Sequence, residues 1–200
     1  MMSKIVDRRT ALSTLLLSAA AVALSACNAP PSRGPFPELT YTHLADIRLD
    51  VATIEIVEAY QAPGTEPNVE HLFPVTPAQS ARRWAEDRLV AVGIDGFARF
   101  IVLDASAIES RNVAPPEGSS LEGAQDRYDM RIAVRIEIVK ANGSRRSFVA
   151  AEATLVDHVE PDTTLNERER AWFRDVETLM RALNTQLEET IAQNFGPYLR

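Results

Sequence analysis

The feature that most constrains the fold is an alternating run of apolar and polar residues near the middle of the chain. Every second position is apolar and most positions between are charged; the apolar set is Tyr128, Met130, Ile132, Val134, Ile136 and Ile138. Because successive side chains of a β-strand point to opposite faces of a sheet, this period of two predicts a strand with one buried and one solvated face. The chain therefore has to build a sheet with a core on one side.

A tight turn is expected just after this run, at Asn142-Gly143. Such a pair adopts the positive φ angles of a type I′ turn and joins two antiparallel strands. Residues facing each other across the hairpin then have numbers that sum to 285, and the facing pairs are all apolar: Ile136 with Val149, Val134 with Ala151, Ile132 with Ala153, and Met130 with Leu155. The register set by the turn thus agrees with the register set by burial. The small alanines leave room for a closely packed helix.

A first helix is predicted to follow Thr76. Thr76 and Gln79 form a capping box, Pro77 stands at the first helical position, and Gly93 marks the expected end. Apolar residues recur between them at three- and four-residue spacing, as on the buried face of an amphipathic helix: Ala81, Trp84, Ala85, Leu89 and Val92. This helix is expected to lie on the sheet.

A second, longer helix is predicted at the end of the chain. It begins with the capping box of Thr164 and Glu167 and stops at Gly196-Pro197. One apolar stripe runs along it, made of Leu165, Trp172, Val176, Leu179, Leu183, Leu187 and Ile191. About 30 residues span roughly 45 Å, enough to lie along the whole hairpin. Four charged residues are assigned to its solvated side: Arg168, Arg170, Arg174 and Glu177.

The first predicted strand starts at Ile47 and changes parity. Apolar residues take odd positions as far as 51 and even positions from 54, so we expect a β-bulge or bend near Ala52 or Thr53, or else a middle part that is buried on both faces. Another strand, over residues 97–105, is apolar on both faces at its centre and belongs inside the sheet. Two loops rich in proline or polar residues, 61–77 and 111–125, separate these elements.

These elements predict an α+β fold with the order β-α-β-β-β-α. Both helices need one apolar sheet face, so the expected architecture is a two-layer sandwich: a four-stranded mixed sheet with two helices on one face. The first helix connects two strands by a right-handed crossover. Those two strands should therefore be parallel and the other pairs antiparallel.

The N-terminus has the layout of an exported lipoprotein precursor. A basic start with Lys4, Arg8 and Arg9 precedes fourteen uncharged, mostly apolar residues, 11–24. That is too short to span a bilayer, which takes about 20 residues. The next residues, Leu24-Ser25-Ala26-Cys27, resemble the lipid-attachment box of bacterial lipoproteins. The resemblance implies that residues 1–26 are a signal peptide and that Cys27 is acylated.

The rest of the chain divides into a tether and one domain. Residues 27–38 include four prolines and are predicted to be an extended, lipidated tether, and residues 39–200 a single periplasmic α+β domain. Loss of the signal peptide leaves 18 basic and 27 acidic residues, a formal charge of −9, which disfavours a nucleic-acid partner. In the enterobacterial sorting rule for such lipoproteins, Asp after the acylated cysteine retains the protein at the inner membrane. Asn28 follows Cys27 here, so the resemblance implies the outer membrane.

The sequence carries no motif for catalysis, a cofactor or a metal. It lacks a Gly-x-Ser-x-Gly elbow, a phosphate-binding Gly-Lys loop and a dinucleotide-binding glycine triplet. His43, His71 and His158 have no His, Cys or carboxylate neighbour at metal-ligand spacing. Glu152 and Asp157, near Arg131 and Arg135, are interpreted as a solvated cross-strand face rather than an acid–base pair. We therefore expect no enzymatic activity, no cofactor and no metal.

The order of lipobox, proline tether, strands and long final helix resembles two families of envelope lipoproteins. One comprises the lipopolysaccharide-assembly lipoproteins, and the other the auxiliary lipoproteins of lipid-transporting ABC systems. The resemblance implies a non-enzymatic accessory or assembly subunit in envelope lipid or lipopolysaccharide transport or biogenesis, with an envelope protein as partner. Two alternatives stay open: a stand-alone lipid- or small-ligand-binding lipoprotein with an apolar cavity between the long helix and the sheet, and a periplasmic enzyme with a polar cleft.

The candidate partner contacts lie in the first long loop. Residues 61–77 are rich in proline yet carry several apolar side chains, which are unfavourable in water. The loop should therefore either pack back on its own domain or dock on a partner. In the second case Leu72 and Phe73 are the candidate contacts, because a few buried aliphatic and aromatic side chains dominate most interfaces.

Overall fold

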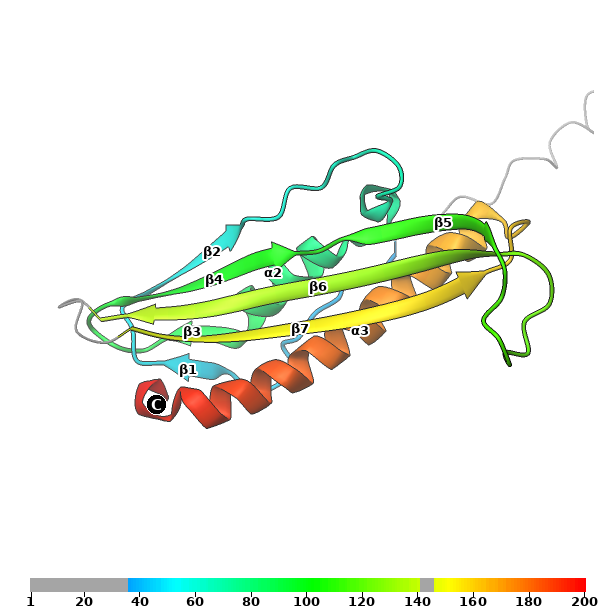
Figure 1. The fold of residues 1–200 in the computed structure, drawn as a ribbon. Helices are drawn as coiled ribbons and strands as arrows, with labels where there is room; N and C mark the ends of the chain where they lie inside the picture. Colours follow the sequence, from blue (N-terminus) through cyan, green and yellow to red (C-terminus); the bar gives the residue numbers. More distant parts are fainter. Residues whose placement is uncertain (1–35, 141–145) are drawn as a thin grey trace, which may run out of the picture. The chain divides into compact units, whose positions relative to one another are not determined.

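The computed structural model describes residues 36–140 and 146–200 (Figure 1). The expected signal peptide, most of the expected tether, Cys27 and the expected turn at Asn142-Gly143 lie outside the described residues. Within the described part, none of the helices combines the length and the apolar character needed to cross a membrane. The described residues form an α+β fold in which a mixed sheet is covered by helices.

A five-stranded sheet makes up one layer. Its longest strands, β6 (Gln125–Val139) and β7 (Arg146–Val159), pair antiparallel along their length. On the other side of β6, the strands β4 (Phe97–Asp104) and β5 (Ala107–Val113) lie end to end, both antiparallel to it. The strand β2 (Thr53–Glu58) pairs parallel with β4 at the edge. The strand directions are therefore those predicted for the crossover and the hairpin.

The predicted hairpin register is confirmed. Ile136 faces Val149, Val134 faces Ala151, Ile132 faces Ala153 and Met130 faces Leu155. All of these side chains are buried or packed against the core. The alternation of the sequence therefore fixes both the pairing of the two long strands and the face of the sheet that carries the core.

The sheet has five strands rather than the predicted four, because residues 107–113, which the sequence did not assign to a strand, form the additional strand β5. The pairing with β6 shifts register between Val102 and Asp104, and the Ser106 N–H donates to Asp104 Oδ1 at 3.0 Å, which turns the chain locally. The chain then resumes as β5 from Ala107. The predicted loop over 111–125 is consequently too long at both ends, since β5 extends to Val113 and β6 begins at Gln125.

The parity change in the first predicted strand corresponds to a bend, as expected. The short strand β1 (Ile47–Leu49) stops before the bend and β2 begins after it, at Thr53. The two strands enter different sheets, because β1 pairs parallel with β3 (Leu89–Ala91) instead of with β4. One continuous strand could not present both sets of apolar side chains to the core, whereas two strands can.

The strand β3 also shortens the first helix. The helix α2 (Pro77–Arg88) starts with the predicted capping box at Thr76 but ends before the expected Gly93, because the pairing of residues 89–91 with β1 replaces the last helical turn. Gly93 has another role. A Cβ atom there would lie 2.6 Å from the backbone of Asp50 and Val51, so the close approach of two chain segments requires glycine.

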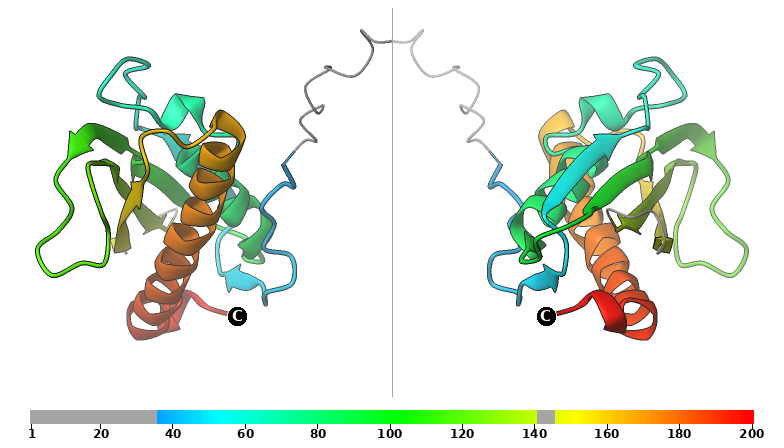
Figure 2. Two further views of the ribbon diagram at one scale, coloured as in Figure 1. Left: turned by 90° about the vertical axis from the view of Figure 1, so that its right-hand side faces the viewer. Right: turned by 90° about the vertical axis from the view of Figure 1, so that its left-hand side faces the viewer.

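Both helices cover the same face of the sheet, as predicted (Figure 2). Trp84 of α2 stacks on Phe100 of β4 with ring centroids 5.7 Å apart. The helix α3 (Leu165–Asn194) has the predicted capping box at Thr164, and its Trp172 contacts the ring of Tyr128 edge-on. The predicted stripe of α3 is buried except for Leu165, which lies in the first turn and is exposed. Short 3-10 helices, η1 (Glu70–Leu72) and η2 (Gly196–Tyr198), complete the described elements.

Candidate partner-binding face

No described helix covers the face of the sheet opposite α2 and α3 (Figure 2). That face carries large, exposed apolar side chains. We call it the uncovered sheet face. Its large apolar residues are between 40% and 63% exposed, and they come from three strands: Leu103, Ile108, Phe148 and Val156. Ile108 and Val156 flank Asp129 of β6 from both sides. Several large exposed apolar side chains on one face of a sheet are typical of an interaction site.

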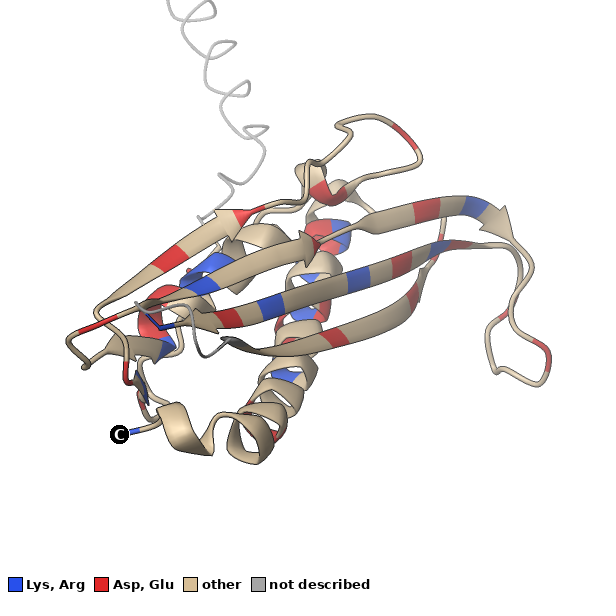
Figure 3. Cartoon of the chain, turned by 60° about the vertical axis from the view of Figure 1, so that its left-hand side comes forward, with Lys and Arg blue, Asp and Glu red and all other residues tan. Residues whose placement is uncertain are grey.

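Acidic and basic residues lie close together along the strands of this face (Figure 3), and several of them form ion pairs with one another. Arg131 of β6 contacts Asp104 at 3.0 Å on one side and Glu152 at 2.6 Å on the other. The other pairs follow the same pattern: Arg99 with Glu55, Arg127 with Asp129, and Arg135 with Glu137. The predicted solvated cross-strand face is thus confirmed for Arg131 and Glu152. With its charges paired, the face offers a partner mainly apolar contacts and weak net charge.

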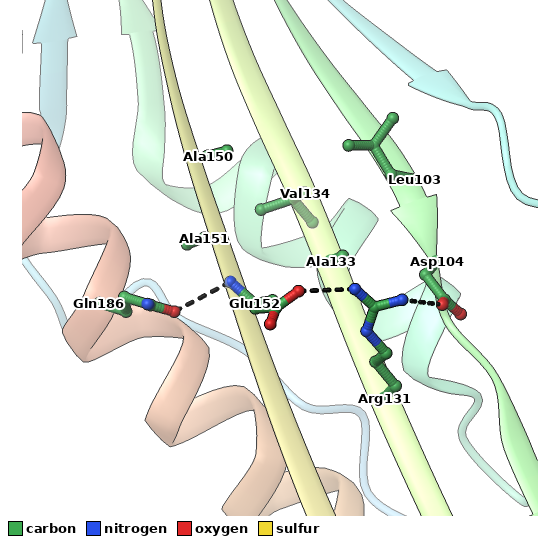
Figure 4. A pocket seen from close by; sticks show the side chains of 9 residues that line it. All are labelled: Leu103, Asp104, Arg131, Ala133, Val134, Ala150, Ala151, Glu152 and Gln186. Atoms are coloured by element: carbon green, nitrogen blue, oxygen red, sulfur yellow. Dashed lines mark hydrogen bonds and ion pairs between the residues drawn. The ribbon is translucent and has the colours of Figure 1, made fainter.

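A hollow of about 370 Å³ lies on this face where the side chains are smallest (Figure 4). Ala133 and Ala150 form part of its lining and Leu103 stands at its side, while Arg131 and its two acidic partners line the other part. Gln186 of α3 reaches the edge of β7, where its Oε1 accepts a hydrogen bond from the Glu152 N–H at 2.9 Å. A hollow with an apolar part and a few fixed polar groups suits one inserted side chain of a partner.

The two contact residues predicted from the first long loop have different surroundings. Phe73 is buried and stacks on Trp172 with ring centroids 4.7 Å apart, whereas Leu72 is 53% exposed. Buried Glu70 holds this part of the loop in place, because its carboxylate accepts hydrogen bonds from the Tyr60 hydroxyl at 2.7 Å and the Ala107 N–H at 3.1 Å. The loop therefore packs back on its own domain around Phe73, and only Leu72 is accessible to a partner.

Sequence reasoning did not single out the apolar residues of the uncovered sheet face. A usable pattern existed, because Phe148 and Val156 occupy positions of β7 that the hairpin register assigns to the solvated side. A large apolar residue at such a position is not needed for the core. The Arg135 guanidinium lies 5.4 Å from the centre of the Phe148 ring. Even with this contact, Phe148 is 63% exposed.

Arg168 is not on the solvated side of α3, contrary to the prediction. Its side chain is 15% exposed and donates to Glu109 Oε1 at 3.1 Å, to the Tyr128 hydroxyl at 2.8 Å and to Asp126 Oδ2 at 3.1 Å. Both carboxylates are buried. The reason is the spacing: Arg168 precedes Trp172 by four residues, so the two side chains share one face of the helix. Burial, and then the Glu109 carboxylate, raise the pKa of Tyr128.

The half-buried carboxyl group of Asp175 on α3 faces Asp157 of β7. Burial, and then the charge of Asp157, raise the pKa of Asp175 to about 7. Within residues 36–140 and 146–200, no three His, Cys, Asp or Glu side chains are arranged to hold a metal ion, and Asp157 and Asp175 are therefore not part of such a group.

Comparisons with known proteins give a distant likeness in structure alone. No protein family model matches the chain, and no curated protein matches it. Among solved structures, the chain is similar to the rare lipoprotein B from Shewanella oneidensis, with a TM-score of 0.36 and 10% sequence identity over 70% of this chain and 95% of that chain. A likeness at this level assigns neither a family nor a function.

Proposed function

We propose that the protein is a lipoprotein held at the outer membrane by lipid on Cys27, facing the periplasm. In this proposal it acts as a non-enzymatic accessory or assembly subunit in envelope lipid or lipopolysaccharide transport or biogenesis. The lipobox supports the location, and the uncovered sheet face supports the activity, which is binding an envelope protein. That face is the observation on which the function rests.

The strength of the proposed membrane attachment at Cys27 depends on how many acyl chains insert into the bilayer. Each buried methylene contributes about 0.8 kcal/mol, and a single chain gives only marginal attachment, so two or three chains on one cysteine are needed for lasting retention. From Cys27 to Phe36, where the described chain starts, there are nine residues, which reach at most about 30 Å when extended. The domain would then stay close to the membrane surface and meet partners embedded in it.

Phe148 is the residue expected to contribute most to the interface. It is the most exposed large apolar residue of the uncovered sheet face, and aromatic side chains are enriched among the residues that dominate binding energy. Leu103 and the nearby hollow add a concave surface to which a partner side chain can fit. Since the charges of the face are already paired with one another, they would specify orientation more than they would add affinity.

The test separates binding from stability. Phe148→Ser combined with Val156→Ser is compared with wild type for recovery of crosslinked envelope protein from intact cells and for the melting temperature of the purified protein. We expect crosslinks to be lost at an unchanged melting temperature, because both side chains are exposed. The matched control is Leu165→Ser, an equally exposed apolar residue on α3 outside this face.

Two outcomes contradict the proposed interface. If the double variant gives the wild-type yield of crosslinks, the uncovered sheet face does not bind the partner. If Leu72→Ser alone abolishes the crosslinks, the first long loop binds the partner instead, which was one of the two alternatives that the sequence left open.

A further inference from the structure

The charges of the uncovered sheet face follow a regular order along its central strand, β6. The even-numbered residues from Tyr128 to Ile138 are buried, so the odd-numbered residues of β6 lie on the uncovered side. Figure 3 shows acidic and basic residues interspersed along this strand. In chain order the residues on the uncovered side are Arg127, Asp129, Arg131, Ala133, Arg135 and Glu137. Reversed in direction, this row is complementary to itself, because each basic residue then meets an acidic or a small one.

A two-fold axis between two copies reverses the row in this way. When two copies pack sheet to sheet and the axis crosses the strands at Ile132, residues of β6 that face each other have numbers that sum to 264. Arg127 then faces Glu137 of the second copy, and Asp129 faces Arg135. A two-fold operation makes each of these contacts twice. One axis therefore gives contacts between opposite charges at both ends of the row.

The neighbouring positions of the axis give the opposite result. An axis one residue earlier would place Arg127 against Arg135 and Arg131 against its own copy. An axis one residue later would place Asp129 against Glu137, and two arginines against each other. Like charges brought together across an interface oppose association. The charges of β6 therefore select one register for two copies.

The apolar residues of β7 fit the same axis. Val156 pairs with Asp129 in the sheet, and Ala150 pairs with Arg135. Because Asp129 faces Arg135 across the axis, Val156 of one copy lies over Ala150 of the second copy. Ala150 lines the hollow of about 370 Å³. An exposed branched side chain thus meets a concave part of the other copy.

The strands on the other side of β6 and the axis itself also fit. Ile108 of β5 and Ile101 of β4 pair with the same two β6 residues, so they too face each other between copies. At the axis, Arg131 lies over Ala133 of the second copy, which places a long side chain over a small one. A single axis therefore matches both the charges and the apolar side chains of the face.

The rest of the chain is less suited to self-association. Without the predicted signal peptide its formal charge is −9, whereas the ion pairs of the uncovered sheet face comprise four arginines and five carboxylates. Most of the excess negative charge therefore lies elsewhere on the chain, and two copies repel each other least through this face.

The dimensions of the face suit a reversible contact. Two sheets pack about 10 Å apart with their strands crossing at about 30°, and their side chains interdigitate. Three rows of strands, about 50 Å long and about 5 Å apart, offer roughly 700 Å² per copy. A specific complex of standard size buries about 800 Å² per partner. Because crossed strands diverge away from the axis, Asp129 and Arg135 contact the second copy more closely than Arg127 and Glu137.

We propose that the uncovered sheet face binds the same face of a second copy of this chain, across a two-fold axis at Ile132. The apolar residues supply the affinity, and the alternating charges set the register. The consequence for activity rests on the proposed function: the second copy covers the face that an envelope protein would bind, so the two compete for it. Dimerisation would then protect the face until the partner displaces the second copy.

The experiment uses the full chain, purified in detergent from overproducing cells and separated from other envelope proteins. Two tagged forms, both carrying Thr154→Cys, are mixed at about 100 μM, above the micromolar dissociation constant that an interface of this size can have. A short bifunctional maleimide then joins them. Thr154 is exposed and pairs with Arg131, one residue from the axis. The same chains without Thr154→Cys give the background from Cys27.

We expect a product that carries both tags, and its yield should fall at least tenfold when both forms also carry Asp129→Arg. Arg135→Asp in both forms should have the same effect, because like charges then face each other twice. A mixture of one form with Asp129→Arg and one with Arg135→Asp should regain the original yield, since every arginine again faces an aspartate. Arg170→Asp, at an exposed position of α3, is the matched control and should leave the yield unchanged. Melting curves verify that each variant is folded.

Three results would overturn the dimer: a yield no higher than the background from Cys27, single charge reversals that crosslink like the original pair, or a mixture of the two reversals that stays as low as each alone. None of these results bears on the envelope partner, whose crosslinks are measured in intact cells. Conversely, if Phe148→Ser with Val156→Ser leaves the partner crosslinks intact while the recovery by charge reversal is observed, the proposed interface fails and the dimer stands.

Discussion

Replacing Arg168 with methionine should destabilise the protein strongly. The substitution keeps an unbranched apolar stem on the buried face of α3 but removes the positive charge that Glu109 and Asp126 share. Among the described residues, Asp126 would then lose its ionic partner, and Glu109 would keep Arg111 alone. Breaking a buried ion pair from one side typically costs about 3–5 kcal/mol, because the remaining charge stays desolvated.

The structure places the expected loss near the lower end of that range, about 3 kcal/mol. Some hydrogen bonds survive: the Tyr128 hydroxyl donates to Glu109 at 2.7 Å, Arg111 Nε donates to Glu109 at 2.8 Å, and the Asn112 N–H donates to Asp126 at 3.1 Å. Even so, a domain of this size has a total stability of only about 5–15 kcal/mol. The loss would therefore remove a large fraction of it.

The assay is urea unfolding at neutral pH, followed by circular dichroism and by tryptophan fluorescence, since Trp172 contacts Tyr128 within the same cluster. Arg170→Met, an exposed neighbour on α3, is the matched control and should change stability by less than about 0.5 kcal/mol. Adding Glu109→Gln and Asp126→Asn to Arg168→Met should recover part of the loss by removing the uncompensated charges. A loss below about 1 kcal/mol in Arg168→Met would refute the reasoning.

Three further predictions concern the anchor, the hairpin and pH. Cys27→Ser should abolish labelling with radioactive palmitate; a labelled variant would refute the anchor. Ile132→Asp should cost several kcal/mol in denaturant unfolding, because it buries an unpaired charge between the sheet and the helices; a fully stable variant would contradict the assigned core face. The raised pKa of Asp175, about 7 when folded, means that stability falls as pH rises from about 4 through 7. Solvent screening limits this to about 1–2 kcal/mol, and Asp175→Asn should remove it when unfolding at pH 5 and pH 8 is compared.

The sequence predicted those parts of the fold that local patterns determine. The period of two along β6 and β7 and the two capping boxes each depend on residues close together in the chain, and all of them are found as expected. The strand β3 could not be predicted in this way. Leu89 and Val92 continue the helical spacing, but the pairing of residues 89–91 with distant β1 makes that segment a strand.

The break between β4 and β5 has a similar cause. It depends on how Asp104 and Ser106 meet the register of β6, which no local pattern reveals. For Arg168 two signals in the sequence conflicted. Its spacing to Trp172 placed it on the apolar stripe, whereas its charge favoured the solvated side, and the prediction followed the charge. Only the positions of Glu109 and Asp126, more than forty residues away in the chain, make its burial favourable.

For the candidate site, the sequence identified an apolar loop but not the orientation of its side chains. Leu72 and Phe73 are adjacent and equally apolar, and the difference between them arises from the stacking of Phe73 on Trp172, 99 residues further along. The exposed residues of the uncovered sheet face come from strands whose pairing has to be known first. Their grouping on one surface is therefore a property of the tertiary structure.

The hydrogen bond from the Glu152 N–H to Gln186 has a consequence for self-association. The strand β7 forms an edge of the sheet and is fourteen residues long, so its outward N–H and C=O groups are a template on which another copy could add a strand. Glu152 is the seventh of these residues, and its outward N–H is already occupied by a side chain of α3. The longest edge is thus interrupted at its middle, which disfavours continuous pairing with a second copy along its whole length.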